Sequence, residues 1–132
     1  MSQENVEIVR AAIDAWNRGD WDGVGKDAAG DFELVPPSQS PLSEPLRGMD
    51  EVRAWAADQQ ETVGDLSIEI EELIESGESI VALIRLAIRP QRADAEVELR
   101  IAHLWTLRDR KLIRCEVFSE REKAIEVAGL AK

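Results

Sequence analysis

The segment from Glu96 to Phe118, EVELRIAHLWTLRDRKLIRCEVF, constrains the fold more than any other part of this 132-residue chain. Apolar and polar residues alternate on both sides of a charged turn at residues 108–111, which predicts two long antiparallel strands. Successive strand side chains point to opposite faces, so the first strand has one apolar face and one mostly charged face. The apolar face is formed by Val97, Leu99, Ile101, His103, Trp105 and Leu107. A pocket against this face would therefore contain the only histidine of the chain.

The returning strand carries Glu116 and Phe118 on one parity and Cys115 on the other. If the register is symmetric about residues 108–110, Glu116 has the parity to approach His103 across the hairpin. Phe118 is then a further candidate for the ligand pocket, and Cys115 points away from the face of His103 by parity. A carboxylate beside an imidazole fixes the ring's tautomer and raises its basicity, which predicts an acid–base dyad oriented by Glu116. The alternatives are a core histidine whose polar atoms are merely satisfied, and a Glu116 that forms a salt bridge with an arginine of the sheet.

Two amphipathic helices are predicted, over residues 2–18 and 49–63, because apolar residues recur there at three- and four-residue spacing. Ala12 lies four residues before Trp16 on one face, so the small side chain leaves room beside the indole. Trp55 lies on the apolar stripe of the second helix. A shorter helix is expected from Asp20, and another over residues 120–130, after a capping serine.

Strands are predicted at residues 32–35, 66–75 and 79–89, in addition to the final hairpin. The proline-rich segment 36–48 indicates an irregular loop, either over the mouth of a pocket or on the surface without a function. Helices that precede an antiparallel meander are typical of an α+β domain with its helices on one side of the sheet. We therefore expect one domain, residues 1–132, in which a curved antiparallel sheet wraps around the N-terminal helices and encloses an apolar pocket.

Three tryptophans, Trp16, Trp55 and Trp105, lie on the apolar faces of their elements. Such rings most often pack in a core, but they also line ligand pockets, and at least two are expected at the cavity wall. Arg85 lies within the apolar run 79–89, where burial without a partner would be costly. It either pairs with Glu116 or faces an anionic group of a ligand, and the pairing is the preferred interpretation.

The formal net charge of −11 argues against a nucleic-acid partner and against an anionic membrane surface. One histidine and one cysteine do not suggest a metal site, and no phosphate-binding or dinucleotide motif implies a cofactor. The single cysteine fits a reducing cytoplasm, and the first ten residues lack the pattern of a signal peptide. We expect a cytoplasmic protein.

Four stretches of the chain resemble the SnoaL-like branch of the nuclear transport factor 2-like superfamily. They are AIDAWNRGDWDGV, RGMDEVRAW, AHLWTLRDRKLIRCEVF and SEREKAIEVAGL, and the resemblance covers nearly the whole chain. It implies a cone-shaped, cystatin-like roll with a pocket for a small apolar molecule. We also expect a homodimer through the outer face of the sheet. The family's hairpin turn is usually Arg-Asp-Gly-Lys, and Arg110 replaces that glycine here.

The superfamily contains ketosteroid isomerases, polyketide cyclases, dehydratases, epoxide hydrolases and members that only bind or dimerise. Matched to this sequence, the isomerases' tyrosine falls at Ala12, their general base at Val35, and their protonated aspartate at or near His103. The resemblance therefore disfavours ketosteroid isomerase activity. Two interpretations are left open. One is a cofactor-independent isomerase, dehydratase or cyclase that acts on an apolar carbonyl compound through His103 and Glu116. The other is a non-catalytic ligand-binding or dimerisation module.

Overall fold

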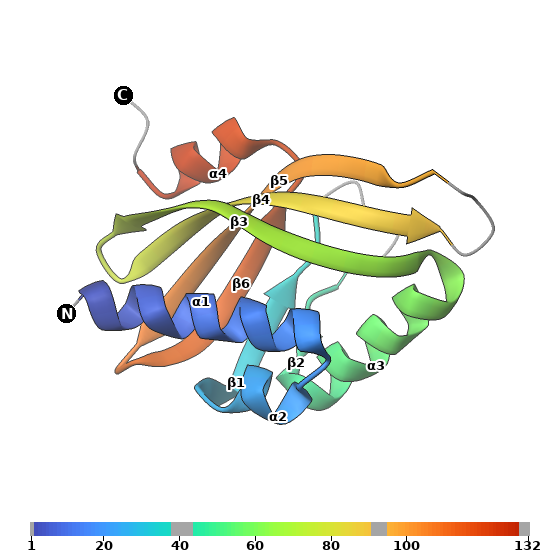
Figure 1. The fold of residues 1–132 in the computed structure, drawn as a ribbon. Coiled ribbons are helices and arrows are strands. Elements are labelled where there is room, and N and C mark those ends of the chain that lie inside the picture. Colours follow the sequence, from blue (N-terminus) through green and yellow to red (C-terminus); the bar gives the residue numbers. More distant parts are fainter. Residues whose placement is uncertain (1, 38–43, 91–94, 130–132) are drawn as a thin grey trace.

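The computed structural model describes residues 2–37, 44–90 and 95–129. The helices in these ranges are α1 (Ser2–Arg18), α2 (Trp21–Gly25), α3 (Gly48–Thr62) and α4 (Arg121–Val127). The strands are β1 (Ala28–Val35), β2 (Leu46–Arg47), β3 (Gly64–Ser76), β4 (Ser79–Pro90), β5 (Val97–Arg108) and β6 (Lys111–Phe118). One curved sheet covers α1 and α3, while α4 lies across its other face (Figure 1). The predicted α+β class, with a curved sheet around the N-terminal helices, is confirmed.

The strand order in the sheet is β2-β1-β6-β5-β4-β3. Neighbouring strands are antiparallel except β1 and β6, which run parallel. The two-residue strand β2 lies in the segment predicted as an irregular loop, where Leu46 pairs with Leu34 of β1. Residues 38–43 of that predicted loop, and residues 91–94 of the predicted turn before β5, lie outside the described residues.

The β5–β6 hairpin closes through Asp109 and Arg110, which both have positive φ, at 52° and 63°. Positive φ at both central residues is typical of the two-residue type I′ turn, whose twist matches that of paired strands. Next to the turn the register is symmetric, with Leu107 opposite Leu112.

A β-bulge interrupts this symmetry after one further step. Thr106 pairs with Arg114 rather than with Ile113, so Ile113 is the extra residue of β6. Beyond the bulge, His103 lies opposite Val117, and Leu104 lies opposite Glu116. Because side chains alternate with a period of two, a shift of one residue moves every later side chain of β6 to the other face.

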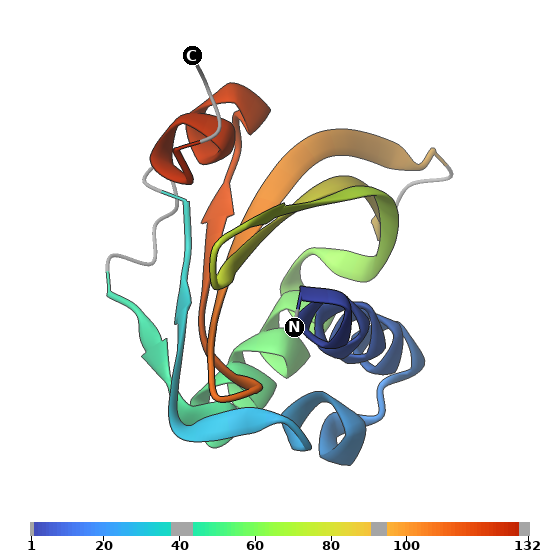
Figure 2. The ribbon, with the colours of Figure 1, turned by 90° about the vertical axis from the view of Figure 1, so that its left-hand side faces the viewer.

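Two apolar clusters lie on opposite faces of the sheet. The larger one fills the concave face beneath α1 and α3, where Val9, Ile13, Val52 and Ile84 are almost fully buried. The smaller one lies between the convex face and α4 and includes Ala102, Leu104, Phe118 and Ala124. Figure 2, viewed at right angles to Figure 1, also shows α4 on the opposite side of the sheet from α1.

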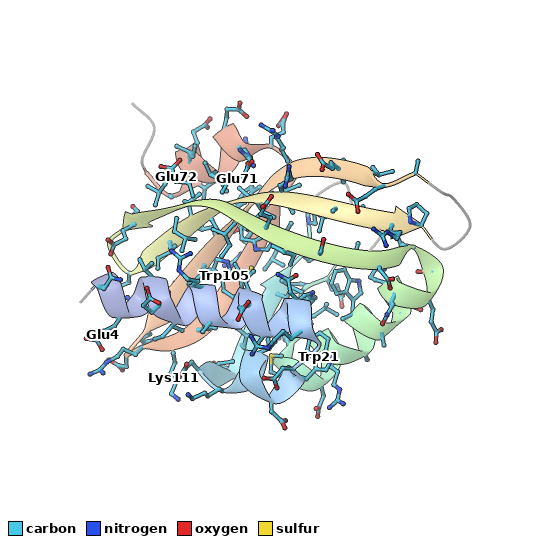
Figure 3. All side chains as sticks on the ribbon, in the orientation of Figure 1. Glu4, Trp21, Glu71, Glu72, Trp105 and Lys111 are labelled. Carbon is cyan, nitrogen blue, oxygen red and sulfur yellow. The ribbon has the colours of Figure 1, made fainter. Side chains whose placement is uncertain are left out.

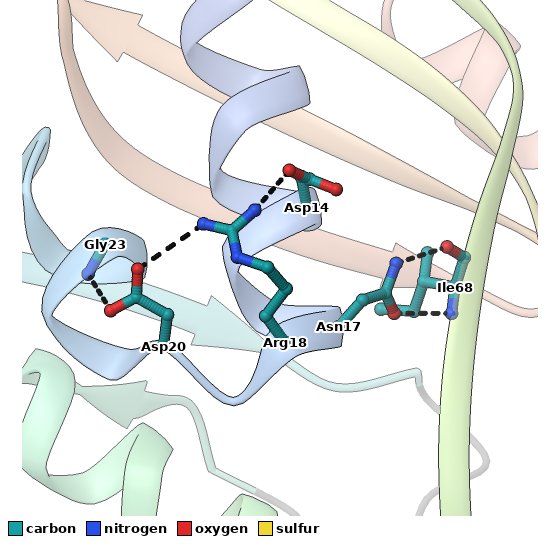
Figure 4. A network of polar contacts seen from close by, with 6 residues as sticks. All are labelled: Asp14, Asn17, Arg18, Asp20, Gly23 and Ile68. Carbon is teal, nitrogen blue, oxygen red and sulfur yellow. Dashed lines mark hydrogen bonds and ion pairs between the residues drawn. The ribbon is translucent and has the colours of Figure 1, made fainter.

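Polar contacts hold α1 against the edge strand β3 (Figure 4). The side-chain amide of Asn17 donates to the carbonyl of Ile68 at 2.7 Å and accepts from its N–H at 2.8 Å. Just beyond α1, the carboxylate of Asp20 accepts from the N–H of Gly23 at 3.0 Å and caps α2. These bonds fix the end of α1 that carries Trp16.

Among the described residues, no helix is both long enough and apolar enough to cross a membrane.

Candidate functional site

A cavity of about 130 Å³ lies between the concave face of the sheet and helices α1 and α3. The helices contribute Ala12, Trp16 and Trp55 to its wall, and the sheet contributes His103, Trp105 and Cys115. Among the described residues, those that line the cavity include no Asp, Glu, Lys or Arg. The wall is therefore apolar except for the histidine, the thiol and the indole N–H groups.

His103 and Trp105 occupy neighbouring positions on the concave face of β5, because residues two apart in a strand share a face. Only 8% of His103 and 7% of Trp105 is exposed. Their rings meet edge to face, with centroids 5.8 Å apart and an interplanar angle of 65°. Phe32 of β1 also stacks on Trp105, with ring centroids 6.4 Å apart and an interplanar angle of 28°. Figure 3 shows Trp105 between the sheet and α1.

Burial lowers the pKa of His103 from 6.5 to about 4. Desolvation disfavours the charged imidazolium, and no neighbouring charge contributes to the shift. Its Nδ1 atom has no hydrogen-bond partner among the described residues. The ring is consequently neutral at neutral pH and supplies one uncharged polar atom to the wall.

The Nε1 atom of Trp105 is likewise buried without a partner in the described part of the chain. An unsatisfied buried polar group costs about 1–3 kcal/mol. Two such atoms on adjacent rings are uncommon, because most buried polar atoms are hydrogen-bonded. Because both residues line the cavity, these two nitrogens are the candidate partners for a polar atom of a ligand.

Glu116 is not beside His103, so the predicted dyad is wrong. The bulge at Ile113 places Glu116 opposite Leu104, on the convex face. There its carboxylate lies 3.5 Å from Nη2 of Arg114. Glu116 thus forms a salt bridge with an arginine of the sheet, which was the alternative to the dyad.

The predicted pocket position of Phe118 is wrong for the same reason. Phe118 lies opposite Ala102 and packs in the convex cluster beneath α4. Cys115, expected to point away from His103, instead lines the cavity. Burial raises the pKa of its thiol well above the usual value, whereas burial lowers the pKa of His103. Both shifts oppose a thiolate–imidazolium pair.

Arg85 pairs with carboxylates on the convex face and takes no part in the cavity. It forms ion pairs with Glu69 and Glu98, the latter at 3.8 Å, and these carboxylates raise its pKa. Pairing was the preferred interpretation, but Glu116 was the wrong partner. The alternation within β4 explains the position, because Ile84 and Leu86 on either side of Arg85 belong to the concave core.

The remaining predicted residues, Ala12, Trp16, Trp55 and Trp105, all line the cavity. Trp16 is held edge-on by Trp21, with centroids 4.9 Å apart and an angle of 71°. Phe32 also lines the cavity and was not predicted to do so, although alternation within β1 places it on the buried face. No group of three or more His, Cys, Asp or Glu side chains that could hold a metal ion occurs in the described ranges.

A family model described as the SnoaL-like domain matches residues 9–115. The chain belongs to the SnoaL-like family. The resemblance to this family is thereby confirmed, and the matched residues include most of α1, all of α3 and the strands that form the cavity up to Cys115. The last of the four sequence stretches, residues 119–130, lies outside the match. A comparison with curated protein sequences gives no significant match.

Solved structures share this fold along nearly their whole length. An NTF2-like protein of unknown function from Burkholderia pseudomallei is 25% identical with a TM-score of 0.79, over 95% of this chain and 97% of that chain. TerC, co-crystallised with polyporic acid, is 22% identical with a TM-score of 0.80, over 96% and 98%. A protein from Catenulispora acidiphila with a ketosteroid isomerase-like fold, in complex with trimethylamine, is 17% identical with a TM-score of 0.74, over 95% and 94%.

Proposed function

We propose that this SnoaL-like protein binds a small, uncharged and largely apolar molecule in the concave cavity. The observation that carries the proposal is a wall in which the described residues offer no charged side chain and in which the one histidine is neutral. A charged ligand would lose its hydration without gaining a partner, at a cost of several kcal/mol. An apolar ligand gains roughly 25 cal/mol for each Å² removed from water.

The volume of the cavity limits the size of the part of the ligand that it can enclose. Apolar cavities of about 150 Å³ accept benzene, so a cavity of about 130 Å³ fits roughly one ring. A hydroxyl or carbonyl oxygen on that ring would have two candidate partners, the Nε1–H of Trp105 and the Nδ1 of His103. Two structural neighbours crystallised with small molecules, polyporic acid and trimethylamine, support a binding role for this fold.

Ligand binding accounts for this site better than acid–base catalysis. An isomerase, dehydratase or cyclase of the expected kind needs Glu116 to orient His103, and Glu116 lies on the convex face. With a pKa of about 4, the imidazole is not in its acidic imidazolium form at neutral pH, and it is a weak base. We infer that His103 recognises a polar atom of the ligand and does not exchange a proton with it.

Calorimetry and NMR with three matched probes, toluene, phenol and benzoate, test this function. We expect toluene and phenol to bind with dissociation constants on the order of 0.1–1 mM, and benzoate at least about tenfold more weakly. Ala12→Leu places a larger side chain in the cavity and should abolish binding of both neutral probes. Ala11→Leu is the matched control, because Ala11 is an exposed neighbour on α1.

Two results would contradict the proposal: the absence of binding by both neutral probes, or benzoate binding as tightly as toluene. A loss of binding in Ala11→Leu equal to that in Ala12→Leu would place the ligand elsewhere.

Homodimerisation through the convex face stays a prediction. The part of this face outside α4 carries paired charges, such as Arg114 with Glu116 and Arg85 with Glu98. Two copies related by a twofold axis could exchange such partners. Sedimentation velocity should then give about twice the monomer mass of 14.7 kDa, and a monomer at all concentrations would contradict the prediction.

A further inference from the structure

An exposed apolar surface continues the cavity wall along β5. Val97 and Leu99 are each 45% exposed, although they lie on the same face of the strand as the buried Ile101, His103 and Trp105. The concave face is thus covered by helices at one end of β5 and open at the other.

The strand register shows that this surface and the cavity are continuous. Leu99 lies directly opposite Leu86, which lines the cavity. Val97 lies opposite Ile88, which in turn pairs with the cavity residue Leu66. Side chains directly opposite each other in an antiparallel pair are in contact, with Cβ atoms about 4.5–5.5 Å apart. We call Val97, Leu99 and Ile88 the apolar shelf.

The exposure of the wall indicates that the cavity opens toward this shelf. Leu112 and Cys115, on the far side of the cavity, are almost completely buried. Leu66 and Leu86, on the side of the shelf, are only partly buried. The charged neighbours Glu98 and Arg100 alternate to the convex face, so they do not interrupt the apolar path.

We propose that the ligand is elongated, with a ring-sized head in the cavity and an apolar extension that lies along the shelf. This inference rests on the proposed function of the cavity. Because the enclosed volume is about 130 Å³, a ligand larger than roughly one ring must leave the cavity at its open end. There the extension meets Leu99 first and Val97 next. The substrate class is then an uncharged aromatic or cyclic molecule with an alkyl, polyene or second-ring extension.

The length of the extension should set the affinity. A fully buried CH₂ group changes an affinity about fourfold, and a group that contacts the protein on one side only should contribute roughly half of that free energy, or about twofold. Four added carbons then predict about a 16-fold gain in affinity. This gain must come from the shelf, since the head group is unchanged.

Calorimetry with phenol, 4-ethylphenol and 4-butylphenol measures this gain in the full-length protein. The test variant is the double substitution Val97→Thr and Leu99→Thr, which places β-branched side chains with high strand propensity at both exposed positions. We expect its affinity for phenol to stay within about twofold of the original, and its gain for 4-butylphenol to fall from about 16-fold to less than about threefold. The control is Val127→Thr, which alters a valine of α4 that is 54% exposed, and there the full gain should remain.

The outcomes separate this inference from the proposed function. Failure of phenol to bind at all would overturn both. Binding of phenol with no gain along the series, or the same gain in the double variant, would overturn the elongated ligand while leaving the cavity as a binding site. The double variant could also keep the gain in affinity along the series and show a changed sedimentation coefficient. That result would show that a second copy of the chain covers the shelf, and it too would overturn the elongated ligand.

Discussion

The two faces of the β5–β6 hairpin differ in the burial and the pairing of their polar groups. On the convex face, Glu116 is partly exposed and its carboxylate lies 3.5 Å from Arg114. On the concave face, His103 and Trp105 are buried, and one nitrogen of each lacks a partner among the described residues. Charges are therefore kept where water and counter-charges reach them, and only neutral polar atoms enter the concave side.

One extra residue in β6 produces this separation. Without the bulge at Ile113, the symmetric register of the turn would continue and Glu116 would lie opposite His103. With the bulge, Cys115 and Val117 face the cavity, while Glu116 and Phe118 face outward. The site thus depends on the register of the hairpin as much as on the residues that it contains.

Inserting one alanine after Arg114 should have the largest effect on this arrangement. With the bulge at Ile113 kept, the insertion moves every later residue of β6 by one position, so that Glu116 lies opposite His103 and Phe118 also turns toward the concave core. An unpaired buried charge costs several kcal/mol, and we expect a total loss above about 5 kcal/mol, comparable to the whole stability of a small domain, so that cooperative thermal unfolding disappears in calorimetry.

Deletion of Ile113 is the control, because it removes the extra residue but leaves Arg114 opposite Thr106 and all later side chains on their present faces, and this variant should still unfold cooperatively. A cooperative transition in the insertion variant would show that a second bulge absorbs the shift.

Removing a concave side chain should cost far more than removing a convex one. Trp105→Ala leaves a cavity in the core and should lower the free energy of unfolding by about 3–5 kcal/mol. Glu116→Ala breaks a partly exposed ion pair and should lower it by less than about 1 kcal/mol. Urea unfolding monitored by far-ultraviolet circular dichroism gives both values. Equal losses of unfolding free energy in the two variants would contradict the difference in burial between the concave and the convex face.

Acid should destabilise the protein through the concave histidine first. The pKa of His103 is about 4 in the folded chain and about 6.5 when unfolded, so below pH 6.5 the unfolded state binds the proton more readily. The contribution of His103 to the free energy of unfolding is fully present above about pH 6.5. It is lost as the pH falls from about 6.5 to about 4, and the total loss is roughly 3 kcal/mol. Glu71 beside Arg121 has a lowered pKa, so its contribution is lost only at pH values below its ordinary pKa of 4.5.

Comparing His103→Gln with the unsubstituted chain in urea titrations at several pH values isolates the contribution of the histidine. The variant should lose little stability between about pH 6.5 and about 4.5. A variant with the same pH dependence as the original would assign that loss to other groups.

The smallest expected change in the free energy of unfolding is at the turn that joins β5 and β6. Arg110 has a φ of 63°, a conformation that costs a non-glycine residue about 1 kcal/mol. Its ion pair with Glu4, at 2.8 Å, is mostly exposed and contributes little. Arg110→Gly should therefore raise the free energy of unfolding by about 0.5–1 kcal/mol, measured in urea. A destabilised variant would show that the contact with Glu4 outweighs the backbone strain.

Much of the fold could be predicted from the sequence, because periodicity reports directly on burial. The spacing of Trp16 and Trp55 in their helices, and of His103 and Trp105 in β5, placed all four on apolar faces, and all four line the cavity. The bulge could not be predicted in the same way. Ile113 is apolar and suits either face, so nothing in its neighbourhood signals an extra residue.

The errors at Glu116, Phe118 and Cys115 all follow from that one position. Strand β2 was missed for a different reason. A strand of two residues has no periodicity of its own and exists only because it pairs with β1.

An NMR pH titration of His103, the only histidine of the chain, would show whether the ring lies in an uncharged, desolvated cavity. Its ring signals should stay constant from about pH 8 to about pH 5 and change with a midpoint near 4. Saturating phenol should shift these signals at neutral pH without protonating the ring. A midpoint at or above about 6.5 would mean that a carboxylate or bulk water reaches the imidazole, and it would contradict an uncharged cavity.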